Sequence, residues 1–98
     1  MIVSITFKNN YGAVPYSAAS IVSEHTDTQH ALEDAFNKTQ NVFCSWSEKP
    51  VAGVTVCHYN FDGTPLRSSM VGDEFTVWTS DKDFKKFEVA RIGFREVA

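Results

Sequence analysis

Apolar and polar residues alternate along the first segment of the chain. Val3, Ile5 and Phe7 fall on one side of an extended backbone, and the residues between them are mostly polar. Because successive side chains of a strand point to opposite faces, this pattern predicts a half-buried strand. The turn-forming residues Asn9-Asn10-Tyr11-Gly12 then end the strand.

A helical pattern follows in the segment HTDTQHALEDAFNKTQN. Thr26 or Asp27 can cap the helix start, and Thr26 with Gln29 has the spacing of a capping box. Asp34 and Lys38 are opposite charges four residues apart, which stabilises a helix. The pattern predicts about three to four turns that end near residues 39–41. The expected buried face consists of Leu32, Ala35, Phe36 and Thr39.

Three further runs favour β structure. Residues 51–61 (VAGVTVCHYNF) and 74–80 (EFTVWTS) are rich in β-branched and aromatic residues. The last run, residues 87–97, contains Gly93, which in a strand indicates a bulge or a close backbone approach. The strong turn signal Asp62-Gly63-Thr64-Pro65 and the polar segment DKDFKK (81–86) separate the runs. These short links predict an antiparallel meander of the last three strands.

The elements together predict an α+β fold in a single domain that covers residues 1–98. We expect an antiparallel sheet of about four strands with one helix packed on one face. The segment Tyr16–Ser23 is ambiguous: its small residues fit an extended chain, and Ile21 and Val22 favour β structure. With 98 residues and a hydrophobic fraction of 43%, the chain can form one core.

Charge and cysteine content limit the partners and the compartment. The net charge is −3, and the lysines at positions 82–86 are interrupted by aspartates, which argues against a nucleic-acid partner. The start MIVSITFK does not resemble a secretory signal, and no run reaches the roughly 18–20 apolar residues of a membrane span. Cys44 and Cys57 fit small buried side chains in a reduced cytoplasm, with a disulfide between them as the alternative.

Residues able to bind a metal or act as nucleophiles are few and poorly spaced. His25 and His30 are five apart, and Cys57 and His58 are adjacent, so on a strand they face opposite sides. No C-x-x-C, H-x-x-x-H or G-x-S-x-G pattern occurs. The sequence therefore predicts no metal site, no cofactor and no catalytic residue. A pairing of Cys44 with His58, or of Cys57 with His25, stays open because catalytic groups assemble in space.

The run RSSMVGD, residues 67–73, is the most distinctive part of the sequence. Gly72 tolerates the positive φ of a tight turn. If the chain folds back there, Arg67 and Asp73 can form an ion pair that fixes the bend. In the alternative interpretation, Arg67, Ser68 and Ser69 offer hydrogen-bond donors to a carboxylate or phosphate of a partner.

Three aromatic residues, Trp46, Tyr59 and Trp78, are further candidates for binding. Trp and Tyr are enriched at the centres of protein interfaces, but they are equally suited to core packing. The sequence leaves both interpretations open for each of the three.

The chain resembles small accessory proteins of phages and conjugative plasmids. The resemblance rests on the helix Leu32–Asn41, Trp46, an R-S-x-S-V-G-D run at Arg67–Asp73, and the closing segment Val89–Val97 with its Gly93-Phe94 pair. Met70 departs from this pattern, which usually has Ser at that position. The resemblance implies a mobile-element origin and a location in the cytoplasm of the host cell.

These observations favour a non-enzymatic protein that binds a host protein, such as a defence or transcription complex. One alternative is a small enzyme or a nucleotide- or anion-binding domain that uses Arg67 and Ser68. Another is a structural or virion component. The first or last strand, if it lies at a sheet edge, could also pair two copies into a homodimer.

Overall fold

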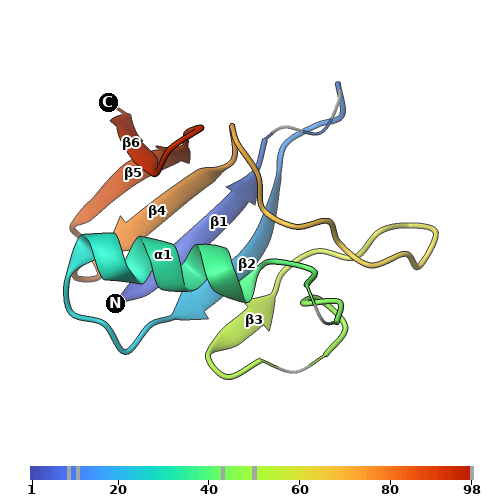
Figure 1. Cartoon of the computed structure of the whole chain (residues 1–98), viewed down its shortest axis with the longest axis horizontal. Coiled ribbons are helices and arrows are strands. Elements are labelled where there is room, and N and C mark those ends of the chain that lie inside the picture. Colours follow the sequence, from blue (N-terminus) through green and yellow to red (C-terminus); the bar gives the residue numbers. More distant parts are fainter. Residues whose placement is uncertain (9, 11, 43, 50, 98) are drawn as a thin grey trace.

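One helix and a six-stranded sheet form the fold in the computed structural model, which describes residues 1–8, 10, 12–42, 44–49 and 51–97 (Figure 1). The elements are β1 (Ile2–Phe7), β2 (Tyr16–Val22), α1 (Thr28–Lys38), β3 (Val54–Val56), β4 (Glu74–Trp78), β5 (Phe84–Val89) and β6 (Phe94–Val97). The strand order is β3-β2-β1-β4-β5-β6, and all neighbouring strands are antiparallel. The α+β class is confirmed, but the sheet has six strands rather than about four.

Strand β1 occupies the interior of the sheet. It pairs with β2 on one side and with β4 on the other, so the expectation that the first strand could be an edge is wrong. Its apolar side chains Val3, Ile5 and Phe7 are fully buried, as their alternation predicts. The ambiguous segment after the first turn is the strand β2, with an irregular register opposite Ile5 and Thr6. The predicted turn at 9–12 includes Asn9 and Tyr11, which lie outside the described residues.

The predicted meander is wrong in its composition. Only Val54–Val56 of the run 51–61 forms a strand, and this strand pairs with β2 at the far edge of the sheet. The run 87–97 instead folds into parts of two strands, β5 and β6, so the meander is β4-β5-β6. Gly93 has φ 70° and accepts a hydrogen bond from the Ala90 amide at 3.0 Å, so it belongs to the turn between these strands.

Gly53 sets the approach of β3 to β2. Its φ is 80°, and its carbonyl accepts a hydrogen bond from the Val22 amide at 2.7 Å. A Cβ atom at this position would lie 2.5 Å from the Val22 carbonyl oxygen. The close contact of the two backbones therefore requires glycine.

The start of helix α1 is capped by Asp27, one of the two residues the sequence favours. The Asp27 carboxylate accepts a hydrogen bond from the His30 amide at 3.1 Å. The predicted capping box of Thr26 and Gln29 is not the cap, since the Gln29 side chain bonds to Glu33 instead. The expected ion pair of Asp34 and Lys38 forms at 3.2 Å.

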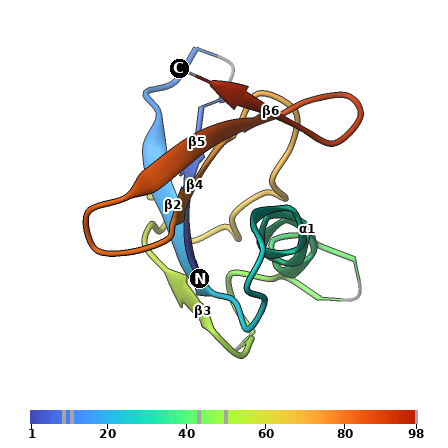
Figure 2. The ribbon, with the colours of Figure 1, turned by 90° about the vertical axis from the view of Figure 1, so that its left-hand side faces the viewer.

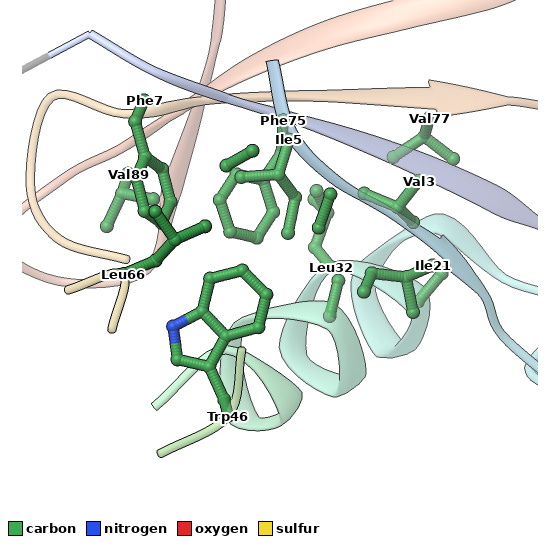
Figure 3. Packing of buried hydrophobic residues seen from close by; sticks show 14 residues of the cluster. Val3, Ile5, Phe7, Ile21, Leu32, Trp46, Leu66, Phe75, Val77 and Val89 are labelled. Carbon is green, nitrogen blue, oxygen red and sulfur yellow. The ribbon is translucent and has the colours of Figure 1, made fainter. Parts of the chain in front are cut away.

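The helix covers one face of the sheet, and no other described element covers the opposite face (Figure 2). It lies across β1 and β4 and buries Ala31, Leu32 and Ala35 against them. Trp46, on the connection between α1 and β3, and Leu66, on the connection between β3 and β4, complete the core (Figure 3). Each large apolar side chain buried in this way contributes about 1.5–3 kcal/mol. The remaining strand residues of the cluster are Val3, Ile5, Phe7, Ala18, Ala19, Ile21, Phe75, Val77 and Val89.

Candidate functional site

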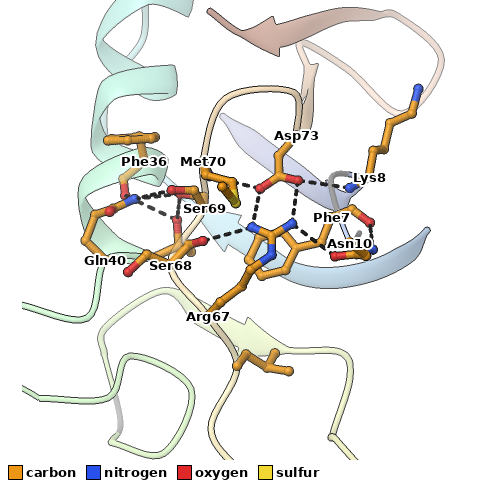
Figure 4. Close-up of polar contacts among 12 residues, drawn as sticks. Phe7, Lys8, Asn10, Phe36, Gln40, Arg67, Ser68, Ser69, Met70 and Asp73 are labelled. Atoms are coloured by element: carbon orange, nitrogen blue, oxygen red, sulfur yellow. Dashed lines mark hydrogen bonds and ion pairs between the residues drawn. The ribbon is translucent and has the colours of Figure 1, made fainter. Parts of the chain in front are cut away.

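Arg67 and Asp73 form a bidentate ion pair at the end of β1 (Figure 4). The two terminal guanidinium nitrogens of Arg67 lie 2.7 and 2.8 Å from the two carboxylate oxygens of Asp73. The guanidinium carbon also lies 4.1 Å from the centre of the Phe7 ring, in cation–π contact. Because the Asp73 residue is fully buried, the pair is shielded from water on its carboxylate side. The predicted pairing of these two residues is confirmed.

Asp73 also holds two backbone segments together. Its carboxylate accepts hydrogen bonds from the amides of Lys8 and Met70, both at 2.9 Å. The Asp73 amide in turn donates to the Met70 carbonyl at 3.0 Å, which closes a tight turn in which Gly72 has φ 95°. The predicted turn at Gly72 is therefore confirmed, and a single carboxylate links this turn to the end of β1.

The two serines of the segment contact the end of helix α1. The Ser69 hydroxyl lies 2.7 Å from the Thr39 hydroxyl and accepts a hydrogen bond from the Gln40 side-chain amide at 2.8 Å. The Ser68 hydroxyl accepts a hydrogen bond from the Asn41 amide at 2.8 Å. The last turn of a helix leaves backbone groups unpaired, and this segment provides partners for the chain just beyond it.

Trp46 lies in the core, with 2% of its surface exposed. Its indole nitrogen donates a hydrogen bond to the Arg67 carbonyl at 2.8 Å, and its ring packs edge-on against Phe7 at 6.1 Å. A buried indole needs such a partner for its N–H group. Of the two interpretations left open for Trp46, the structure supports core packing.

The residues 67–73 thus join the helix end, Trp46 and the end of β1 through contacts inside the fold. Ser69 is buried, and the Arg67 guanidinium donates hydrogen bonds to Asp73, Asn10 and the Ser68 carbonyl. Groups already satisfied in this way bind an outside anion only if internal hydrogen bonds are broken. The geometry favours the structural interpretation of this run.

The cysteines and histidines lie apart from this cluster. Cys44 and Cys57 are both exposed and free, so the expectation that they are buried is wrong. His58 stacks on Tyr16 at 3.8 Å, and burial raises the pKa of the Tyr16 phenol. Within the described part of the chain, no three His, Cys, Asp or Glu side chains are grouped to hold a metal. The described helix is also too short to cross a bilayer.

The His30 imidazole and the Asp27 carboxylate lie 2.5 Å apart at the exposed start of α1. The hydrogen bond between the two side chains raises the pKa of His30 and lowers the pKa of Asp27. Both shifts have the direction expected when each charged form stabilises the other. This pair belongs to the cap of the helix.

A row of four apolar side chains crosses the face of the sheet opposite the helix. Val22 faces Ile2, Ile2 faces Trp78, and Trp78 faces Phe84 in the registers of β2, β1, β4 and β5. The Trp78 ring lies 4.8 Å from the Phe84 ring, and its indole nitrogen donates to the Ser4 hydroxyl at 3.1 Å. We call these four residues the apolar row.

The apolar row is exposed: Ile2, Phe84 and Val22 have 45%, 48% and 57% of their surface in contact with solvent. Among the four, the sequence indicated only Trp78 as a candidate for binding. Ile2 and Phe84 lie on the solvent side of the alternation in their strands, and only the cross-strand registers show that they form a row. A shallow hollow borders the row and is lined by Met1, Ile2, Val22, Trp78, Thr79, Ser80 and Asp81.

Tyr59 lies elsewhere, on the connection between β3 and Leu66, with 79% of its surface exposed. Neighbouring Phe61 is fully exposed and was not singled out in the sequence. The structure therefore separates the predicted binding residues into three places: the cluster around residues 67–73 with Trp46, the apolar row with Trp78, and the connection with Tyr59.

Comparison with protein-family models, with curated proteins and with solved structures finds no match to this chain.

Proposed function

We propose that this protein is a non-enzymatic binding module of a phage or related mobile element that acts by covering a surface of a host protein. A defence or transcription complex of the host is the kind of target that we propose. The bound surface of the module is the solvent-facing side of its sheet.

The apolar row is the observation that carries the proposal. An antiparallel sheet with one open face normally alternates apolar residues inward with polar residues outward. The next positions along this open face follow that rule, with Ser4 and Thr76 facing each other and Lys86 beside Thr76. The apolar row departs from this alternation on four neighbouring strands of the sheet, β2, β1, β4 and β5. Contiguous exposed apolar residues mark interaction sites.

The surroundings of the row match the anatomy of a protein interface. Trp78 lies inside the row, between Ile2 and Phe84, and tryptophan is among the residues that most often dominate binding energy. Charged residues lie further along the same face, where Lys86 and Lys8 both approach Glu74, at 3.9 and 3.4 Å. An apolar centre bordered by polar and charged groups is the usual arrangement of such a surface.

Site-specific photo-crosslinking tests this proposal. Phe84→p-benzoylphenylalanine places the crosslinker in the row, and Thr55→p-benzoylphenylalanine places it on the same face at the edge strand β3 as a matched control. In a bacterial lysate we expect a discrete adduct from position 84 whose partner peptide identifies one protein, and none from position 55.

A second variant tests whether the adduct at position 84 depends on the apolar row. Trp78→Ser removes the centre of the row, and we expect it to reduce the adduct at position 84 at least tenfold while circular dichroism shows a retained fold. An adduct of unchanged yield in this variant, or equal adducts from positions 84 and 55, would count against the row as the binding surface.

A further inference from the structure

The connection between β3 and Leu66 forms a projecting loop with two exposed aromatic rings. We call residues 57–66 the aromatic loop. In Figure 1 it is the yellow segment that extends furthest from the helix and the sheet. Phe61 at its outer part is fully exposed, and Tyr59 is almost as exposed. These exposed rings have a fixed position only if the loop that carries them is ordered.

A tight turn places Phe61 at the corner of the loop. The Gly63 amide donates a hydrogen bond to the Asn60 carbonyl at 3.0 Å, so residues 60–63 form a β-turn with Phe61 at its second position. Gly63 follows the corner with φ 78°, a conformation that glycine adopts without strain. Side chains at the corner of such a turn point outward, away from the chain that the turn joins.

Side-chain hydrogen bonds fix the turn in this shape. The Asn60 amide nitrogen donates to the carbonyls of Thr64 and Pro65, both at 3.1 Å. The Asp62 carboxylate accepts hydrogen bonds from the Thr64 amide at 3.0 Å and from the Thr64 hydroxyl at 2.7 Å. These bonds also lower the pKa of Asp62. The loop is therefore held by its own polar groups, without contact between Phe61 and the core.

Both ends of the aromatic loop are attached to the body of the protein. At one end, the His58 ring stacks on Tyr16 at 3.8 Å with an angle of 19° between the ring planes. At the other end, Leu66 is buried in the core and its amide donates to the Ser47 hydroxyl at 2.9 Å. Attachment at both ends gives the exposed rings a fixed position relative to the sheet.

We propose that the aromatic loop inserts Phe61 into a concave apolar pocket of a partner protein, with Tyr59 at the rim of that pocket. This inference rests on the proposed function, since it names a second contact surface of the same binding module. A fully exposed ring on a convex turn loses little water against a flat surface, and only a pocket can surround it. Because the loop is already ordered, binding costs little additional conformational entropy.

The charge of the loop favours a neutral pocket over a membrane surface. Asp62 is the one formally charged side chain among residues 57–66 at neutral pH, and one of its oxygens already bonds to Thr64. Loops that insert into anionic membranes usually combine aromatic residues with Lys or Arg, and this segment has neither. The asparagine and threonine groups that hold the turn offer no charge to an oppositely charged site.

The first test uses β-cyclodextrin as a soluble, neutral apolar cavity of about the size of one ring, followed by NMR. We expect saturable shifts at the Phe61 ring, which are abolished by Phe61→Ala. The matched control is Phe84, a half-exposed ring on the sheet, where we expect shifts at least fivefold smaller. Equal shifts at both rings, or none at Phe61, would overturn the inference.

The second test asks whether the loop is ordered before binding. Backbone ¹⁵N order parameters at residues 59–64 should approach about 0.85, the value of rigid backbone, and fall below about 0.6 in Asn60→Ala. The substitution removes the side chain that bonds to Thr64 and Pro65. Low order parameters in the unaltered protein would contradict the claim that the loop is held ready for insertion.

The third test identifies the partner surface that contacts Phe61. Phe61→p-benzoylphenylalanine in a bacterial lysate should give an adduct whose partner peptide lines a concave apolar pocket, and Asn60→Ala should reduce its yield about fivefold or more. An adduct at position 84 without one at 61 would refute this inference and leave the proposed function intact. Loss of both adducts would refute both.

Two further measurements test whether Phe61 contacts a membrane or a second copy of this chain instead of a partner protein. Vesicles of phosphatidylcholine and phosphatidylserine should not sediment with the protein; sedimentation lost in Phe61→Ala would show a membrane partner instead. Analytical ultracentrifugation should show no self-association that depends on Phe61; a dimer lost in the same variant would show that a second copy fills the role.

Discussion

Asp73→Ala should destabilise the protein more than any other change of a single charged residue among those described. The substitution removes the carboxylate that accepts hydrogen bonds from the Lys8 and Met70 amides and pairs with Arg67. The two amides would be left in a part-buried site without their acceptor, and the guanidinium would lose its counter-charge. Each of these losses acts on the folded state alone.

The expected magnitude follows from burial. Removing one partner of a buried ion pair costs about 3–5 kcal/mol, and each orphaned buried amide costs about 1–3 kcal/mol. Asp73 is fully buried, but the Arg67 side chain is 25% exposed, so water solvates the guanidinium left behind and reduces the ion-pair cost to about 1 kcal/mol. The two amides lie in part-buried sites and cost about 1 kcal/mol each, at the low end of their range. We therefore expect a loss of about 3 kcal/mol, against a total stability of about 5–15 kcal/mol for a domain of this size.

Thermal and urea denaturation followed by circular dichroism measure this loss. At about 4–8 °C per kcal/mol, the melting temperature should fall by roughly 12–24 °C. Glu74→Ala is the matched control: the neighbouring carboxylate faces the open side of the sheet and pairs with Lys8 and Lys86 at 3.4 and 3.9 Å. Such outward pairs contribute less than about 1 kcal/mol.

A double-mutant cycle with Arg67→Ala separates the ion pair from the amide bonds. If the two side chains act together, the double variant should be more stable than the sum of the single losses predicts, by about 1–3 kcal/mol. The reasoning is refuted if Asp73→Ala costs no more than Glu74→Ala, because the buried carboxylate would then not be what holds the turn to β1.

Three other predictions concern the framework of the fold. His30 should titrate above its ordinary pKa, and Asp27→Asn should return the pKa of His30 to its ordinary value; NMR titration of the imidazole checks this. The bond between His30 and Asp27 stabilises the helix start most between about pH 4 and 6.5. This contribution is lost as pH rises through the raised pKa of His30, and it is lost as pH falls through the lowered pKa of Asp27. Gly53→Ala should cost at least about 1 kcal/mol by urea denaturation, because the new Cβ would lie 2.5 Å from the Val22 carbonyl oxygen at a positive φ; an unchanged midpoint would contradict the close approach. Trp46→Phe should lose about 1–2 kcal/mol from the missing indole donor while the secondary structure is retained, and a neutral result would mean that the hydrogen bond to the 67–73 segment contributes little.

The elements with a strong periodic pattern could be predicted from sequence. The alternation of Val3, Ile5 and Phe7 correctly predicted a strand with one buried side, and the helical spacing around Leu32 correctly predicted α1. The turn at Gly72 and the pairing of the charges that flank it were also predicted, because both depend on local chemistry. Short-range signals of this kind are determined by residues close together in the chain.

The pairing partners of the strands could not be predicted in the same way. The run 51–61 has good strand composition, but its edge position beside β2 depends on the backbone contact at Gly53. The turn that separates β5 from β6 has Arg91 and Ile92 at its corners, neither of which is a typical turn residue. Only Gly93 signalled an irregularity, and glycine in a strand is equally compatible with a bulge.

The surface sites depended on registers that sequence alone does not give. The sequence leaves core packing and surface binding equally open for Trp46 and Trp78, yet Trp46 lies in the core and Trp78 on the open face. The apolar row exists only because Ile2 and Phe84 are placed on either side of Trp78 by pairings between distant segments. The exposure of Phe61 follows from a turn whose corner the sequence signal placed slightly further along the chain.

The interior position of β1 has a consequence for synthesis on the ribosome. The contact between the Lys8 amide and the Asp73 carboxylate joins residues 65 positions apart, and β1 meets β4 across a similar separation. A nascent chain can therefore form the first hairpin early but must leave one flank of its central strand open until β4 has emerged. During that interval the unpaired flank is the part of the molecule most exposed to misassociation, and folding should speed up sharply once β4 is released.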